Sequence, residues 1–353
     1  MSVLDGRKES RERGPVTNTL NVVVDRDELR IDDVTISFQR TLRIPESGLH
    51  SLPPGLGRFP LRRVEDYPDT APREWLAKGG VMLPIYQREA MWLAFGSDDG
   101  GSSGVPCALQ IGVGKVCAVS GEAWDEQLSV QPQNYVALPA QPWLDGINSG
   151  NGEIRQFVAV PLGLDASVEA QVTGEEVHGG IQLRAVPLTA AARQELDKQR
   201  AEECVRVLTL DGLSDGPDLM ACAPPVGAAM GLGAGGRMKQ EVYEDDRPVA
   251  DYDESCAQRV FVHLCSAAQW TAITGEVPPP TPVDREWYVR AGLPWFDYYD
   301  ADAHDVAPSA KLAVVKPVGE VLKDDSKPFT PIDPKVVVTL KGATGGVVAD
   351  GSW

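Results

Sequence analysis

The sequence has little positive charge for its length. Its 353 residues carry 33 Lys and Arg against 51 Asp and Glu, which gives a formal net charge of −18. Such an excess of negative charge repels nucleic-acid phosphates and anionic membrane surfaces. We therefore expect neither nucleic acid nor a membrane surface as a partner.

Long hydrophobic runs are also missing. No segment reaches the ~18 consecutive apolar residues of a membrane-spanning helix. The first residues, MSVLDGRKESRERGPVTN, are polar and lack the apolar stretch of a secretory signal. These features predict a cytoplasmic protein without membrane insertion. The six cysteines form no CxxC pair, so we expect reduced thiols rather than disulfides.

Motifs of enzyme chemistry are scarce. There are four histidines and no GxSxG nucleophile motif. His263 and Cys265 lie two residues apart, which suits a nucleophile pair, but in an apolar strand they are more often core residues. His178 stands beside Glu175 and Glu176 in an expected hairpin turn. This trio is the basis of one alternative, an enzyme of unfamiliar type.

A glycine-rich run, GLGAGG at residues 231–236, invites comparison with phosphate-binding loops. A dinucleotide-binding loop follows a strand and opens a helix, and a Walker loop needs Gly-Lys-Ser or Gly-Lys-Thr. Neither context is present here. The run is therefore expected to be a packed glycine loop inside a long irregular connection over residues 212–236.

Alternation of apolar and polar residues is the strongest positive signal. Residues 154–183 contain three such runs separated by glycine turns, and Val168, Ala170 and Val172 share one parity. This period predicts antiparallel strands with one buried face. Similar patterns predict further strands at residues 81–86, 90–95, 260–265 and 336–340. They also predict one long strand, or two strands joined at a bulge, at residues 34–44, and a strand or hairpin at residues 107–119.

Helices are predicted from their capping residues. The expected helices cover residues 70–79 with Thr70 as cap, 190–203 with Thr189 as cap, 266–275, and 281–292. The sequence thus predicts a mainly β fold, an antiparallel β-sandwich or jelly roll with three or four short peripheral helices and extended terminal arms.

The expected organisation has three parts. Residues 1–18 form a disordered N-terminal tail, residues 19–280 form the β-sandwich body, and residues 281–353 form a helix plus an extended C-terminal arm. The arm, which ends in Trp353, is expected to pack on the body or on a neighbouring copy.

The segment PWFDYYDADAHD is a candidate interaction site. Its aromatic residues are Trp295, Phe296, Tyr298 and Tyr299. Its aspartates are Asp297, Asp300, Asp302 and Asp305. The aromatics suit a partner or a sugar, and the aspartates resemble the start of a calcium loop. However, Asp305 stands where an EF-hand needs Gly, and Lys311 stands where it needs Glu.

The amino-acid sequences of several segments resemble those of a family of uncharacterised bacterial and fungal proteins. The segments are ISFQRTLRIP, LPPGLGRFPLRRVEDY, PIYQREAMWLAF, GKVCAVSGEAWDE, QPWLDGI, RQFVAVPLG, VEAQVTGEE with GGIQL, and LPWFDYYD. The resemblance covers about residues 30–320 and implies one integrated unit. It implies no activity and no catalytic residues.

The leading hypothesis is a non-catalytic cytoplasmic protein with a binding or scaffolding role that self-associates into a homo-oligomer. Extended arms and a terminal Trp suit the exchange of segments between copies. No cofactor is expected under this hypothesis. A cation- or carbohydrate-binding β module, with calcium as the cation, is the first alternative, and the unfamiliar enzyme is the second.

Overall fold

The described part of the chain consists mainly of β-strands. The structure is a computed structural model, and it describes residues 22–50, 52–53, 55–96, 106–150, 152–207, 230–280, 305–323, 346–347 and 350–353. The strands are β1 (Val22–Asp25), β2 (Glu28–Ile31), β3 (Val34–Thr41), β4 (Leu49–His50), β5 (Gly55–Arg58), β6 (Arg62–Arg63), β7 (Val81–Pro84), β8 (Ala90–Phe95), β9 (Cys107–Val113), β10 (Val116–Cys117), β11 (Val136–Leu138), β12 (Trp143–Leu144), β13 (Gly146–Gly150), β14 (Glu153–Pro161), β15 (Ile181–Pro187), β16 (Met230–Lys239), β17 (Gln258–Cys265) and β18 (Gly346–Val347).

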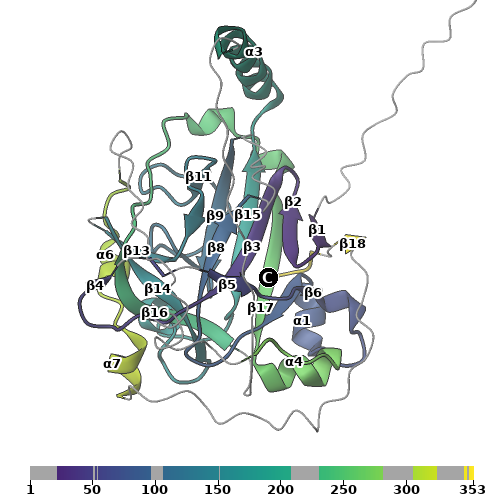
Figure 1. Cartoon of the computed structure of the whole chain (residues 1–353), viewed down its shortest axis with the longest axis vertical. Coiled ribbons are helices and arrows are strands. Elements are labelled where there is room, and N and C mark those ends of the chain that lie inside the picture. The colour runs from purple at the N-terminus through teal and green to yellow at the C-terminus, as the bar shows by residue number, and fades with distance from the viewer. Residues whose placement is uncertain are drawn as a thin grey trace, which may run out of the picture.

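Two ladders of long strands contain most of the pairing (Figure 1). In one ladder β2, β3 and β8 follow one another, and β8 leads to β14, which pairs with β16. In the other, β11, β9, β15 and β17 lie in that order, and β7 borders β17. Two pairings, β7–β17 and β4–β16, are parallel. The mainly antiparallel β class is confirmed, and the sandwich or jelly-roll arrangement stays a prediction.

Both ladders contribute to one hydrophobic cluster. Ile36 and Phe38 of β3 are fully buried in it, as are Ile111 of β9 and Leu183 of β15. Full burial of such a side chain stabilises the fold by about 1.5–3 kcal/mol. The two ladders therefore depend on the same core.

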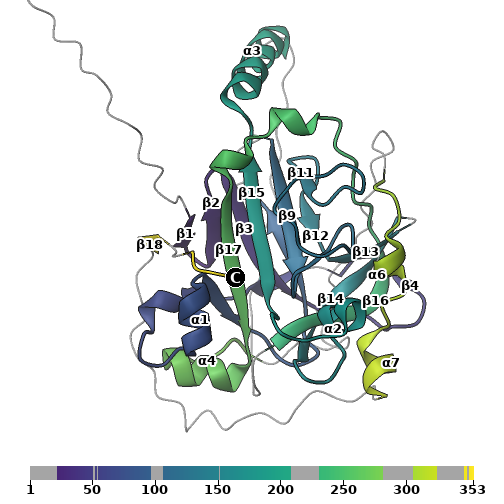
Figure 2. The ribbon, with the colours of Figure 1, turned by 180° about the vertical axis from the view of Figure 1, so that it is seen from behind.

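The helices lie around the strands (Figures 1 and 2). In the described residues they are α1 (Arg73–Lys78), α2 (Val168–Thr173), α3 (Ala190–Val207), α4 (Ala267–Thr274), α6 (Ala310–Ala313) and α7 (Val318–Leu322). Trp75 of α1 and Trp270 of α4 share a buried cluster, so these two helices cover the same end of β7 and β17. Across the described part of the chain, no helix combines the length and apolar character needed to cross a bilayer.

Capping chemistry correctly predicted two of these helices. The Ser266 hydroxyl accepts a hydrogen bond from Gln269 N at 3.3 Å, and Gly275 ends α4 in the left-handed conformation at φ 71°. The Thr189 hydroxyl accepts from Ala192 N at 3.2 Å at the start of α3. The predicted cap of α1 is wrong. Pro72 occupies the cap position, and the Thr70 hydroxyl instead donates to Ile273 O at 2.7 Å.

The middle of the 154–183 pattern is not a strand. Residues 168–173 form helix α2, because the Ser167 hydroxyl caps its start by accepting from Ala170 N at 3.0 Å and Gly174 ends it at φ 82°. Val168 and Ala170 are buried together with Glu169, so the alternating faces inferred from parity are wrong here. Local capping therefore outweighed the period-2 pattern.

The glycine run at 231–236 is also not a loop. It lies within β16, which pairs with β14 along most of its length. A Cβ on Gly233 would lie 2.5 Å from Val318 Cγ2, and one on Gly236 would lie 2.2 Å from Pro45 O. The glycines therefore let other segments approach both faces of a central strand, and the expected irregular connection does not extend to residue 236.

Some predictions concern residues outside the described ranges. These are the tail at 1–18, the helix at 281–292 and the strand at 336–340.

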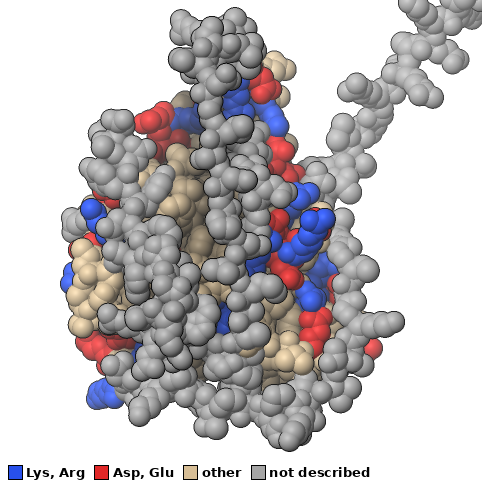
Figure 3. Space-filling view, viewed as in Figure 1, with Lys and Arg blue, Asp and Glu red and all other residues tan. Residues whose placement is uncertain are grey.

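On the face in Figure 3, described acidic and basic residues lie next to one another along the edges. On this face the described charges of opposite sign are therefore mixed, although the chain is acidic overall.

Candidate binding pocket

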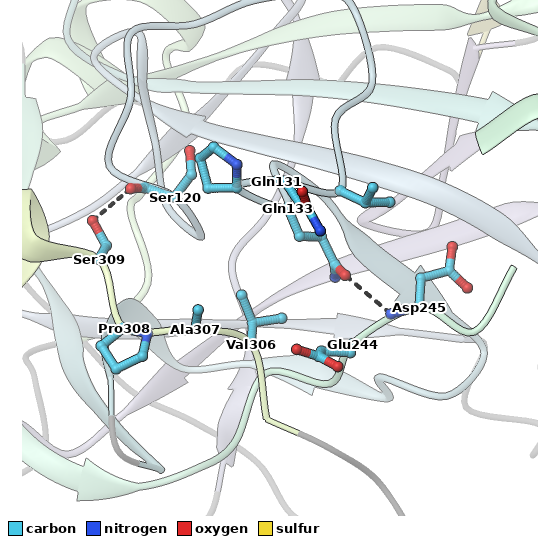
Figure 4. A pocket seen from close by; sticks show the side chains of 11 residues that line it. Ser120, Gln131, Gln133, Glu244, Asp245, Val306, Ala307, Pro308 and Ser309 are labelled. Carbon is cyan, nitrogen blue, oxygen red and sulfur yellow. Dashed lines mark hydrogen bonds between the residues drawn. The ribbon is translucent and has the colours of Figure 1, made fainter. Parts of the chain in front are cut away.

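A pocket of about 500 Å³ lies between two segments that are far apart in the sequence. One side consists of residues 131–133, and Val306, Ala307 and Pro308 face them across the opening (Figure 4). Ser120 and Ser309 lie at one end, and Glu244 and Asp245 at the other. The volume falls in the range of small-molecule sites, about 300–1,000 Å³.

The buried amide of Gln133 fixes one side of the pocket. Its Nε2 donates to Tyr135 O at 2.9 Å and to Tyr243 O at 3.0 Å. Its Oε1 accepts from Asp245 N at 3.0 Å, the contact drawn in Figure 4. A side chain with three such bonds cannot rotate without leaving buried polar groups unpaired, so this side is preorganised.

Asp245 is held as firmly as Gln133. Its Oδ2 accepts from Tyr135 Oη at 2.9 Å and from Tyr252 Oη at 2.7 Å, and its Oδ1 accepts from Arg247 N at 3.1 Å. Burial, together with the nearby Asp245 carboxylate, raises the pKa of both tyrosines well above its usual value. Both phenols therefore stay protonated and keep donating to the carboxylate at neutral pH.

The opposite side is attached to the body at both ends. Asp305 Oδ1 accepts from Val242 N at 3.0 Å and Oδ2 accepts from Gly152 N at 2.9 Å. Val306 N donates to Val242 O at 2.6 Å, and the Ser309 hydroxyl donates to Ser120 O. Residues 306–309 are therefore fixed relative to the strands.

Glu244 is a carboxylate at this pocket for which the described part of the chain supplies no partner. Its side chain is exposed, and within the described residues it makes no hydrogen bond or ion pair. Burial raises the pKa of nearby Asp305, and the negative charge of Glu244 raises that pKa further. The pocket therefore combines an apolar surface from Val130, Pro132 and Pro308 with a local negative potential.

A second hollow of about 550 Å³ adjoins the pocket and shares Ser120 and Pro132 with it. Glu122 and Asp125 line it, and Glu122 is paired with Lys311 of α6. The adjoining hollow is thus also acidic, with one of its carboxylates neutralised by a neighbouring cation.

The predicted interaction segment lies almost wholly outside the described residues. This applies to the aromatics Trp295, Phe296, Tyr298 and Tyr299 and to the aspartates Asp297, Asp300 and Asp302. Asp305 is described, and both of its carboxylate oxygens accept backbone hydrogen bonds. Among the described residues, no group of three metal-ligating side chains gathers. The calcium site stays a prediction.

The acidic residues around His178 serve the backbone. Glu176 accepts hydrogen bonds from the amides of Gly163, Leu164, Asp165 and Ser167. Burial raises the pKa of Glu176, but hydrogen bonds from the Ser167 side chain and from these backbone amides outweigh burial and leave the pKa lowered. Glu175 is exposed. The structure thus gives Glu176 the role of holding a loop.

Glu169 has a similar role that the sequence did not reveal. This buried carboxylate accepts from the amides of Val177, His178 and Gly179 at 2.8–2.9 Å. It closes the connection between α2 and β15 and fixes the backbone of His178. The two glutamates together hold the backbone of this region, and the alternative of an unfamiliar enzyme stays a prediction.

His263 and Cys265 lie in the core. The His263 ring stacks on Trp75 at 4.6 Å and lies 4.5 Å from the Phe261 ring, and its Nε2 is 2.9 Å from Gly79 O. Burial lowers the pKa of His263 to about 3 and raises that of the Cys265 thiol. A neutral imidazole and a protonated thiol agree with the core interpretation of this pair.

The residues of the pocket had no signal in the sequence that marked them as a site. Asp245 and Glu244 stood in an acidic run, and Gln133 lay between turn residues. No family model, curated protein or solved structure matches this chain. The resemblance to a bacterial and fungal family therefore stays a prediction, and the site rests on its geometry.

Proposed function

We propose that this protein is a non-catalytic binding protein, and that its pocket takes a small ligand with an apolar body and a cationic amine or guanidinium group. The observation that carries the proposal is Glu244, a carboxylate with no partner among the described residues, beside an apolar surface and a rigid hydrogen-bonded wall. A cation placed there gains a partner without breaking any contact of the fold.

The expected affinity follows from simple magnitudes. Covering about 100 Å² of apolar surface contributes about 2.5 kcal/mol at 25 cal/mol per Å². Pairing with an exposed carboxylate adds up to about 1 kcal/mol. The sum of about 3.5 kcal/mol corresponds to a Kd of about 3 mM for a fragment that fills only part of the pocket.

The test is a titration with benzylamine, monitored by ligand-observed NMR, with benzyl alcohol as the uncharged counterpart. We expect benzylamine to bind with a Kd of a few millimolar and benzyl alcohol about fivefold more weakly. Glu244→Gln should reduce the affinity for benzylamine to that of benzyl alcohol. Asp246→Asn is the matched control, because exposed Asp246 carries the same charge next to the pocket without lining it. Equal binding of benzylamine to the Glu244→Gln variant and to the unchanged protein would contradict the proposal.

The remaining parts of the proposal concern location and partners. A cytoplasmic location is supported by the described cysteines Cys107, Cys117, Cys256 and Cys265, all of which are free thiols, as expected in a reducing compartment. The net charge of −18 supports a role without nucleic acid. We also propose that copies of the chain self-associate, and the end of the chain offers a specific means.

A further inference from the structure

The last four residues of the sequence contact one surface of the body. The residues that they contact are Ala77, Gly79, Lys115, Trp124, Arg259 and Phe261, and this set is called the tail groove below. Figure 2 shows the yellow segment ending against β17, near α1. Two of its residues, Asp350 and Trp353, contact the groove through their side chains, and Gly351 and Ser352 contact it through their backbone.

Asp350 is recognised by Arg259. Arg259 Nε donates to Asp350 Oδ2 at 2.8 Å, and Arg259 Nη2 donates to Gly351 O at 3.2 Å. Arg259 Nη1 also donates to Glu126 Oε1 at 2.6 Å, so the body holds the guanidinium in place independently of the tail. The two side chains of the Arg259–Asp350 pair are only 27% and 21% exposed, which strengthens the ion pair over a fully exposed one.

Trp353 is recognised by cations and aromatic rings. Arg259 Cζ lies 4.6 Å and Lys115 Nζ 5.3 Å from its ring centroid. The Phe261 ring meets it edge to face at 5.8 Å, and the Trp124 ring lies 6.0 Å away. Both kinds of contact favour an aromatic ring at this position. Trp353 Nε1 donates to Asp350 Oδ1 at 3.0 Å, which joins the two recognised side chains.

The backbone contacts of Asp350 and Ser352 leave room only for Gly at position 351, which lies between them. Asp350 forms an antiparallel bridge with Gly79, and Ser352 N donates to Ala77 O at 3.3 Å. A Cβ on Gly351 would lie 2.2 Å from Ala77 O. Ser352 is exposed, so its side chain is free to vary. The contacts of the tail groove therefore select the sequence Asp-Gly-x-Trp, in which x is any residue.

The chain approaches the groove as an added strand. The backbone of β18 pairs antiparallel with β1, with Val347 opposite Val23 and Gly346 opposite Val24. Strand addition to a sheet edge followed by a side-chain anchor is a general mode of peptide recognition.

The charge of the groove suits this peptide. Lys115 and Arg259 face Trp353, and Lys78 Nζ lies 4.7 Å from the Phe261 ring centroid. Burial lowers the pKa of Lys115, and the nearby charge of Arg259 lowers it further. In a chain with a net charge of −18, these cations make a local site for an acidic, aromatic peptide.

We propose that the tail groove is a recognition site for Asp-Gly-x-Trp, and that it exchanges its occupant with the same segment of a second copy of this chain. About 22 residues lie between Lys323 and Gly346, and a chain of that length extends to at most ~75 Å, whereas a domain of this size is ~50 Å across. The segment is therefore long enough for the tail of one copy to reach the groove of another. Exchange makes the same contacts within and between copies, so concentration decides which form dominates.

The first test measures recognition. The acceptor is the full chain carrying Asp350→Ala and Trp353→Ala, whose groove residues are intact. A fluorescent peptide of residues 346–353, GVVADGSW, should bind it with a micromolar Kd in fluorescence polarisation, and Trp353→Ala in the peptide should weaken binding at least thirtyfold. Ser352→Ala in the peptide is the matched control and should change the Kd less than twofold. The unchanged protein should bind the peptide at least tenfold more weakly than the acceptor, because its own tail competes.

The second test measures exchange. The donor is the full chain carrying Arg259→Ala and Lys115→Ala, which keeps its tail but loses the contacts that hold it. Donor and acceptor should each be monomeric at 10–50 μM by light scattering and should form a one-to-one complex when mixed (~10 μM suffices for a micromolar Kd). Excess GVVADGSW peptide should dissociate the complex, because it competes with the donor's tail for the groove. Peptide binding without complex formation would overturn exchange, and equal binding of the Trp353→Ala peptide would overturn recognition.

Discussion

The buried carboxyl of Asp145 predicts a pH dependence of stability that one substitution should remove. Asp145 is the single residue between β12 and β13 and is 2% exposed, and its Oδ2 makes no hydrogen bond in the described part of the chain. Its backbone N donates to Gln240 Oε1 at 3.0 Å, which keeps the residue in place. Burial raises the pKa of Asp145 from 3.8 to about 7.

The sign of the effect follows from proton binding. Between pH 4 and pH 7 the folded protein keeps the Asp145 proton, whereas the unfolded chain has lost it. The contribution of Asp145 to stability is therefore complete below about pH 4 and is lost as the pH rises to about 7. At ~1.4 kcal/mol per pH unit, the loss is about 4 kcal/mol.

The perturbation is Asp145→Asn, which has the same shape and cannot ionise. The free energy of unfolding is measured in urea at pH 4.5 and pH 8 for both proteins. We expect the difference between the variant and the unchanged protein to shift in favour of the variant by about 3–4 kcal/mol over this interval. Other titrating groups are common to both proteins and cancel in the difference.

Asp246→Asn serves as the control, because Asp246 is exposed. Its difference from the unchanged protein should vary by less than 0.5 kcal/mol between the two pH values, as is usual for exposed positions. A pH-independent difference for Asp145→Asn would refute the reasoning. It would mean that the carboxyl is charged or hydrated in the folded protein.

Two further predictions concern packing and a buried ion pair. Gly236→Ala should lower the free energy of unfolding by about 3 kcal/mol, because the added methyl meets the backbone of Pro45, and urea unfolding without a loss above 1 kcal/mol would contradict this. Arg40 and Glu89 pair at 2.7 Å with side chains 4% and 2% exposed, so Arg40→Met alone should cost about 3–5 kcal/mol. The double variant Arg40→Met and Glu89→Leu should regain most of that loss in the same assay, and an additive further loss would contradict it.

Local signals in the sequence were enough for several elements. Ser266 and Gly275 cap the two ends of α4 through contacts with backbone groups close to them in the sequence. The helix at residues 266–275 was therefore predicted correctly. The strands β7, β8 and β17 were predicted from short apolar runs between turns. Each of these elements depends mainly on residues close to it in the chain.

The errors arose where distant residues decide the outcome. The glycines of β16 are required by Val318, Pro45 and Val158, which lie far from them in the sequence. The parity of residues 168–172 indicates a strand, but Ser167 and Gly174 cap the two ends of this segment as a helix. A pattern of alternation is therefore weaker evidence when a cap and a stop residue enclose it.

The pocket could not be predicted from the sequence for the same reason, since residues far apart in the chain form it. Gln133, Asp245 and Val306 come together only because the segments after β10, β16 and residue 305 are hydrogen-bonded to one another. The apolar ring of Trp353 on a polar tail indicated a contact with the body or with a neighbouring copy, and in the structure the ring contacts Arg259 and Phe261. Its partners on β17 and the β9–β10 turn required the structure.

The most direct test of the binding role is amide chemical-shift mapping of the protein during titration with benzylamine. We expect saturable shifts at the amides of Gln131, Gln133, Glu244, Asp245, Val306, Ala307 and Ser309, which the Glu244→Gln substitution abolishes. Shifts that are scattered over the surface, or that persist unchanged in that variant, would contradict it.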